Sequence, residues 1–194
     1  MDIIFATLFG LIIGSFLNVV IYRMPRKLSL SSPRRSYCPK CSKTLAWSDN
    51  IPVISWAVLG GKCRYCKEPI SGQYPLVELL SGIAGAASVI YYGTTFTAAV
   101  VYLLTATLIA ITFIDFEFKI IPNRISYPGM TIGLLMGIAT QFYGPFAHPL
   151  TQSPIDSLLG MIAGGGFFWS IGALYYLFTK RVGLGGGDIK LMGM

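Results

Sequence analysis

Residues 97–114 read TAAVVYLLTATLIAITFI, an apolar run without a single charged side chain. At about 1.5 Å of rise per residue, a helix of this length crosses most of the roughly 30 Å hydrocarbon layer of a bilayer. Mean hydropathy is +0.64, and only 12% of residues are charged, about half the share of a globular domain. The pattern predicts an all-α polytopic membrane bundle. Four further runs of similar character occupy residues 3–22, 75–92, 126–143 and 156–178.

The basic residues indicate how these runs are oriented. Ten of the 15 Lys and Arg lie in residues 23–74, two in 115–125 and three in 179–190, whereas the other connections carry none. If the chain changes side at each run, all fifteen face one side, which the positive-inside rule makes cytosolic. We therefore expect the N-terminus outside, and we interpret the net charge of +7 as a topology signal and not as nucleic-acid binding.

The polar segment 23–74 holds all four cysteines, as two C-x-x-C pairs separated by 21 residues. Two such pairs complete a tetrahedral four-thiolate site, and its usual metal is zinc, with iron as the minor competitor. Two disulfides are the alternative, which a cytosolic segment disfavours. A closed site of this kind folds a domain and does not catalyse. The sequence thus predicts a first transmembrane helix over 1–22, a small cytosolic zinc-binding insert over 23–74 and a transmembrane bundle over 75–194. The cysteines are Cys38, Cys41, Cys63 and Cys66.

Two acidic residues stand apart from the other six. Asp115 ends the run at 97–114, at the carboxyl end of the predicted helix, where an acid opposes the helix dipole and the low dielectric. Asp188 follows three glycines and opens a further apolar segment. Two carboxylates that share one proton form an aspartic-protease pair, in which one activates water and the other protonates the carbonyl oxygen. By contrast, Glu78 is expected in the first turn of the 75–92 helix, where it complements the dipole.

Two non-peptidase interpretations remain open at this point. The same aspartates suit a cation or proton transporter as relay groups, although relay acids usually lie near the bilayer midplane and these lie at the predicted cytosolic edge. A non-enzymatic membrane scaffold, whose zinc module binds a partner, leaves both aspartates incidental.

Several short motifs, taken in order, resemble one family, the bacterial prepilin leader peptidases, also called type IV prepilin peptidases, of the GxGD class of membrane aspartic proteases. Four of the ten lie wholly within the polar segment 23–74. The ten motifs are GSFLNV at 14–19, YR at 22–23, CPKC at 38–41, LAW at 45–47, NIPVISW at 50–56, GKCRYC at 61–66, YPLVE at 74–78, ID at 114–115, IP at 121–122 and GGGDIK at 185–190.

The resemblance implies an aspartic endopeptidase that removes the short basic leader of prepilin or pseudopilin substrates at the cytosolic face of the bacterial inner membrane. It also implies N-methylation of the new amino terminus with S-adenosylmethionine, an activity linked with the cytosolic insert. Asp115 and Asp188 carry over as the catalytic pair, and the four cysteines as ligands of a structural zinc. Residues 75–194 are then the catalytic bundle.

The resemblance leaves the methyl-donor site unassigned, and the chain departs from the family pattern at two points. No residue is assigned to the methyl donor, because no G-x-G-x-x-G turn follows a strand. Residue 123 is Asn where the family leads us to expect Asp, and the chain ends at Met194, six residues after Asp188. Since the family continues through further helices, we expect this chain to be truncated at its C-terminus. Pilus, type II secretion and competence substrates are equally compatible with these motifs.

Overall fold

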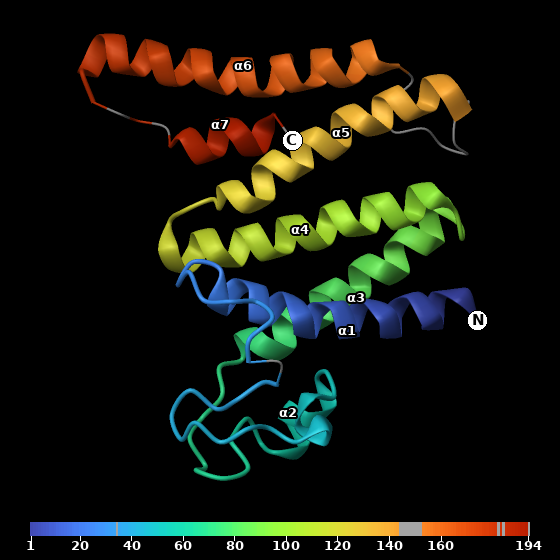
Figure 1. Ribbon diagram of the computed structural model, residues 1–194, viewed down its shortest axis with the longest axis vertical. Helices are drawn as coiled ribbons and strands as arrows, with labels where there is room; N and C mark the ends of the chain where they lie inside the picture. The colour runs from blue at the N-terminus through green and yellow to red at the C-terminus, as the bar shows by residue number, and fades with distance from the viewer. Residues whose placement is uncertain (34, 144–152, 182, 184, 194) are drawn as a thin grey trace. The chain divides into compact units, whose positions relative to one another are not determined.

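The computed structural model describes residues 1–33, 35–143, 153–181, 183 and 185–193 (Figure 1). Within these residues the secondary structure is helical, and extended pairing is limited to two isolated β-bridges. The all-α prediction is therefore confirmed. The chain divides into two compact units, Met1–Phe118 and Lys119–Met194, which are described separately below.

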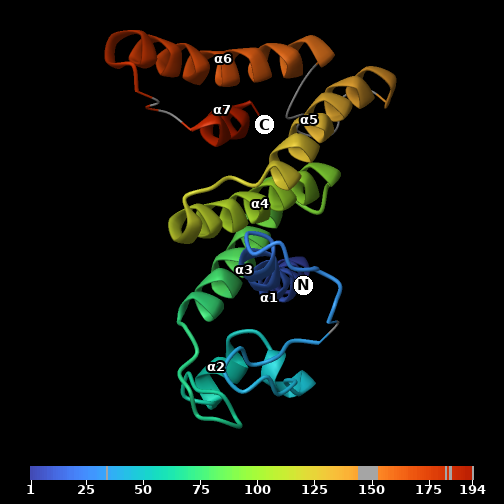
Figure 2. The same ribbon diagram turned by 60° about the vertical axis from the view of Figure 1, so that its left-hand side comes forward.

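Three long helices form the frame of the first unit: α1 (Asp2–Arg23), α3 (Gln73–Tyr92) and α4 (Phe96–Phe118) (Figures 1 and 2). Helices α1 and α3 pack backbone to backbone, because Gly10 and Gly14 bring no side chain into the contact. A Cβ added to Gly14 would lie 2.6 Å from the Cα of Glu78. Asn18, buried in the same contact, donates from Nδ2 to the carbonyl of Tyr74 at 3.0 Å.

An ion pair joins the ends of α1 and α4. Arg26, just after α1, pairs with Glu117 near the end of α4 at 2.9 Å, and its guanidinium lies over the rings of Tyr22 and Phe118. Because the polar segment leaves α1 at this point, the last turn of α4 lies at the same end of the helical bundle as that segment. Asp115 belongs to this last turn.

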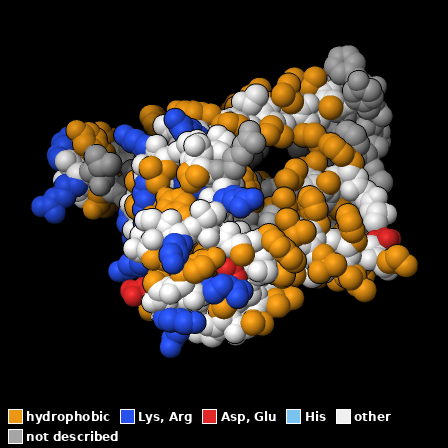
Figure 3. Space-filling model, turned by 60° about the horizontal axis from the view of Figure 1, so that its bottom comes forward, with side chains coloured by type: hydrophobic (Ala, Val, Ile, Leu, Met, Phe, Trp, Pro, Cys, Tyr) orange, Lys and Arg blue, Asp and Glu red, His pale blue; other side chains and the backbone are white. Residues whose placement is uncertain are grey.

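The polar segment between α1 and α3, called the insert below, contains little regular structure. It holds a 3₁₀ turn, η1 (Trp47–Asn50), a short helix, α2 (Ile54–Val58), and the two β-bridges. Buried Arg23 ties its start to α1 by donating from Nη1 to the carbonyls of Ser29, Leu30 and Pro33 at 3.1–3.3 Å. Figure 3 brings the insert toward the viewer and shows many Lys and Arg side chains there.

The second unit contains α5 (Asn123–Tyr143), α6 (Pro154–Thr179) and α7 (Gly186–Met192). Ser153 caps α6 by accepting a hydrogen bond from the backbone N–H of Asp156 at 3.2 Å. Two glycines allow close packing within the unit: a Cβ on Gly137 would strike Ser157, and one on Gly164 would strike the carbonyl of Met192. The connection 144–152 lies outside the described residues.

Four of the described helices, α1, α3, α4 and α6, are long and apolar enough to cross a membrane. Helix α5 forms where a fifth span was predicted, but it is not among them. Polar residues lower its mean hydropathy, and Pro128 interrupts its hydrogen bonding. Of the five predicted spans, four form helices of sufficient hydropathy, and the fifth forms a less apolar helix that contains a proline.

Candidate active and metal sites

The four cysteines predicted as metal ligands come together in the insert. Their sulfur atoms all lie within 4.8 Å of one another, and the Sγ atoms of Cys38 and Cys66 are 3.8 Å apart. Zinc–thiolate bonds of about 2.3 Å in a tetrahedron require sulfur atoms about 3.8 Å apart. All four cysteines are free of disulfides. The donor set and its spacing therefore fit a four-thiolate zinc ion.

The backbone around the two C-x-x-C pairs repeats one turn. Cys38 N–H donates to Lys43 O at 3.0 Å and Cys63 N–H donates to Glu68 O at 2.8 Å, five residues onward in both cases. A β-bridge closes each turn, Tyr37 with Thr44 and Lys62 with Pro69. In each turn, the residue just before the one whose carbonyl accepts this hydrogen bond has a positive φ near 60°. These residues are Ser42 and Lys67. The two turns thus present their thiols in matching geometry from two separate stretches of chain.

The thiols are not equally ready to lose a proton. Backbone N–H groups of Cys66 and Tyr65 lower the pKa of Cys63 to about 7. The N–H of Glu68 acts in the same direction on Cys66, but burial and the neighbouring thiols outweigh it and raise the pKa of Cys66 to about 12. Closely spaced sulfurs cannot all become anionic unless a cation balances them. A bound divalent metal supplies that cation.

Asp115, the first predicted catalytic residue, lies half-buried in the last turn of α4. The residue before it, Ile114, is fully buried and fixes this face of the helix against the unit. Among the described residues no hydrogen bond or ion pair engages the Asp115 carboxylate, whereas Glu117, two residues later, pairs with Arg26. Asp115 thus lies at the insert end of α4.

Asp188, the second predicted catalytic residue, is exposed in the first turn of α7. Its Oδ2 accepts a hydrogen bond from the N–H of Gly185 at 3.2 Å, which orders the glycine turn around it. Gly187 allows α7 to pass close to Ile121, because a Cβ there would lie 2.9 Å from the Cβ of Ile121. Lys190 Nζ donates to Asn123 Oδ1 at 3.0 Å, so the Asn at position 123 accepts a hydrogen bond from the helix that carries Asp188.

The predicted pair is divided between the two compact units. Asp115 belongs to Met1–Phe118, and Asp188 belongs to Lys119–Met194. Each carboxylate stands at a helix terminus, one at the end of α4 and one at the start of α7. Their joint action stays a prediction from the sequence.

Glu78 has a role that sequence reasoning missed. Helix α3 begins at Gln73, two residues earlier than predicted, so Glu78 lies in the second turn and not in the first. The side chain is buried, and its Oε2 accepts the backbone N–H of Val53 at 2.7 Å. Val53 has φ +62°, a conformation that costs a β-branched residue energy and persists only where its surroundings hold it. Glu78 thus fixes the insert on α3 and does not serve as a dipole partner.

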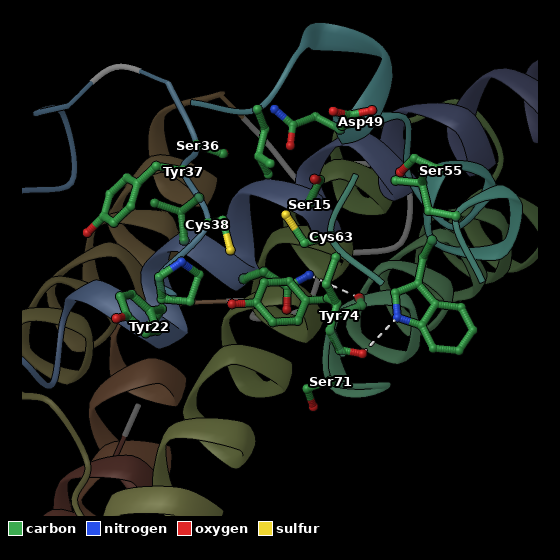
Figure 4. Close-up of a pocket in the computed structure, with 18 of the residues that line it drawn as sticks. Ser15, Tyr22, Ser36, Tyr37, Cys38, Asp49, Ser55, Cys63, Ser71 and Tyr74 are labelled. Carbon is green, nitrogen blue, oxygen red and sulfur yellow. Dashed lines mark hydrogen bonds between the residues drawn. The ribbon is translucent and has the colours of Figure 1, made fainter. Parts of the chain in front are cut away.

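A cavity of about 320 Å³ lies between the insert and the adjoining ends of α1 and α3 (Figure 4). Side chains from α1, the insert and α3 line it, so it belongs wholly to the first unit. Among them are Asn18, Asp49, Trp56 and Glu78, and two zinc-site cysteines, Cys38 and Cys63, form part of the same wall. No single sequence motif predicts this cavity, because residues far apart in the chain form its walls.

Comparison with known proteins matches the chain in two parts. Residues 8–92 match the Bacterial Peptidase A24 N-terminal domain, and residues 102–194 match the Type IV leader peptidase family. The chain is 39% identical to the prepilin leader peptidase/N-methyltransferase of Myxococcus xanthus over 98% of its own length and 54% of that relative. It is 35% identical to the protein of that name from Neisseria gonorrhoeae, over 96% of the chain and 70% of the relative.

A third relative of that name, from Aeromonas hydrophila, is 35% identical over 95% of the chain and 69% of its own length. The chain therefore spans from about half to seven tenths of the length of these three relatives. No solved structure matches it. Membership in a peptidase family favours the enzymatic interpretation over the transporter and scaffold alternatives. Two family domains in succession, together covering most of residues 8–194, establish that the chain belongs to the type IV leader peptidase family of membrane enzymes.

Proposed function

We propose that the protein is a membrane aspartic endopeptidase that removes the short basic leader of type IV prepilins or pseudopilins at the cytosolic face of the inner membrane, and then methylates the new amino terminus with S-adenosylmethionine. The observation that carries the proposal is the match of both halves of the chain to one peptidase family. The names of its relatives pair leader peptidase with N-methyltransferase.

The proposed sidedness rests on the basic residues. The insert carries ten of the 15 Lys and Arg, and the Arg26–Glu117 ion pair joins the end of α4 to the end of α1 from which the insert departs. An insert on the cytosolic side puts the Asp115 end of α4 on that side too. By the same rule, the basic leader of a substrate would stay on the cytosolic side of the membrane. The leader would therefore meet the enzyme on that side.

In the proposed cleavage, one carboxylate takes a proton from water while the other, protonated, donates its proton to the carbonyl oxygen of the scissile bond. The resulting diol collapses, the C–N bond breaks and the amine leaves with a proton. Asp115 and Asp188 are the proposed pair. A zinc ion held by the four cysteines would have no open coordination position for these steps, and it would instead hold the insert folded.

The test is co-expression with a prepilin, followed by mass spectrometry of the pilin. Wild-type enzyme should remove the leader, and Asp115→Asn and Asp188→Asn should each reduce cleavage at least a thousandfold, since each residue supplies half of one coupled proton transfer. Glu117→Gln is the matched control, because it removes an exposed acid two residues from Asp115 and should keep cleavage. Wild-type cleavage by Asp188→Asn would overturn the assignment of the pair.

A further inference from the structure

We propose that the cavity between the insert, α1 and α3 is the binding site of the sulfonium methyl donor, with Asp49 as its principal polar contact. The inference rests on the proposed methyltransferase function and assigns residues to it. Neither Asp115 nor Asp188 lines the cavity, so the peptidase chemistry leaves this site unused.

Asp49 supplies the first observation. Its side chain is only 2% exposed, and Oδ1 accepts from Arg64 Nε at 2.8 Å and from Arg64 Nη2 at 2.5 Å. The hydrogen bond from Arg64 keeps the pKa of Asp49 below its usual range, so the carboxylate is ionised at neutral pH. Its second oxygen, Oδ2, is buried and has no hydrogen-bond partner among the described residues. A buried, ionised oxygen without a partner is costly unless a ligand brings it a donor or a cation.

The other charged groups of the wall are already engaged. Arg23 donates to three backbone carbonyls, Lys40 lies 3.5 Å from Glu68, and Glu78 holds the N–H of Val53. Asp49 Oδ2 is therefore the acceptor on a charged lining residue that the described part of the chain leaves without a hydrogen-bond partner. The site suits a ligand that brings N–H or O–H donors to this oxygen.

Aromatic side chains provide the rest of the recognition surface. Tyr22, Tyr37, Trp56 and Tyr74 all line the cavity, and Figure 4 shows Tyr22, Tyr37 and Tyr74 along it. Trp56 is held by its own Nε1, which donates to Ile70 O at 3.1 Å. Aromatic faces attract onium cations and stack on planar bases. A cavity of about 320 Å³ also falls at the lower end of the range for small-molecule sites, about 300–1,000 Å³.

These features fit S-adenosylmethionine, which combines a planar base, a diol, an ammonium group and a sulfonium cation. In the transfer, the lone pair of the new terminal amine forms a bond to the methyl carbon, the C–S bond breaks with its electron pair going to sulfur, and the nitrogen loses a proton to water. The chain's own contribution is to bind and orient the donor: Asp49 Oδ2 accepts its N–H or O–H groups, and the aromatic rings contact its base and cation.

The test measures binding of tritiated S-adenosylmethionine to the purified full chain. Wild-type protein should bind, and Asp49→Asn should weaken binding about tenfold to a hundredfold, the usual effect of losing a charged hydrogen-bond partner. Arg35→Gln is the matched control. It removes the charge of an exposed insert side chain that does not line the cavity, and it should change affinity less than about threefold. Zinc content, measured on each variant, reports whether the insert is folded.

Photolabelling of wild-type protein with the bound donor gives a readout that needs no variant. Trypsin releases residues 44–62 as one peptide, which contains both Asp49 and Trp56, and the label should appear on it. A label confined to residues 119–194, or wild-type affinity in Asp49→Asn, would overturn the cavity assignment while the methyltransferase function stands. If both variants lose zinc, their insert is not folded and their affinities do not test the cavity. The position of the label on wild-type protein then decides whether the donor binds there. If wild-type protein cleaves prepilin but binds no donor, the proposed methylation fails and the cavity assignment fails with it.

Discussion

The contact between α1 and α3 gives a stability prediction whose size follows from one glycine. A methyl group added at Gly14 would place its Cβ 2.6 Å from the Cα of Glu78 and 3.1 Å from the carbonyl oxygen of Val77. Carbon atoms in contact normally lie about 3.5–4.0 Å apart, so the two helices must separate by about 1 Å. Both obstructing atoms belong to the backbone, and no rotamer change relieves the clash. Overpacking of this kind costs about 1–3 kcal/mol.

A matched substitution isolates the steric part of that cost. Gly160 also lies inside a long helix, but a Cβ there meets nothing within 4 Å. Replacing either glycine by Ala gains the same helix propensity, about 1 kcal/mol, so the difference between Gly14→Ala and Gly160→Ala should equal the steric term. The unfolding constants should then differ by about 5- to 150-fold. Circular dichroism during SDS titration in mixed micelles measures both. Equal stability of the two variants would refute the close packing of α1 on α3.

Three further predictions follow from the zinc site, the basic residues and the separation of the two activities. Purified protein should carry about one zinc per chain and Cys66→Ser should lose it, because four thiolates close the shell; elemental analysis without metal, together with two disulfides, would contradict this. Reporter fusions should read as external at Gly93 and as cytosolic at Ser48, and the reverse result would overturn the proposed sidedness. Methylation of an already cleaved pilin should survive Asp115→Asn, and its loss in a correctly folded variant would show that the two activities share a site.

The features predicted well from the sequence are those that depend on neighbours along the chain. Uncharged runs located α4 and α6 to within a few residues, because helix formation in an apolar run depends on the run itself. The C-x-x-C spacing likewise predicted the four-sulfur cluster, since each turn positions two thiols locally. The hydropathy of α5 was overestimated because its glycines and polar residues were counted within an apolar block.

The features that escaped prediction depend on contacts between distant segments. Glu78 and Val53 are 25 residues apart, and only the folded insert brings that N–H to the carboxylate. The cavity has the same origin, since residues 15 to 78 contribute its walls and no periodicity encodes their meeting. The proposed pairing of Asp115 with Asp188 joins residues of two different compact units and stays a prediction, because the spacing of the two residues along the chain carries no information about it.

The two proposed chemistries therefore use the chain differently. Every residue that lines the proposed donor cavity belongs to Met1–Phe118, whereas the two proposed catalytic carboxylates belong to different units. The proposed order of events can be followed within the first unit. If cleavage takes place beside Asp115, it would release the new amine at the end of α4, which the Arg26–Glu117 ion pair joins to the end of α1 where the insert begins. The cavity lies against that same end of α1, so the amine would form on the side of the bundle where the methyl donor would bind.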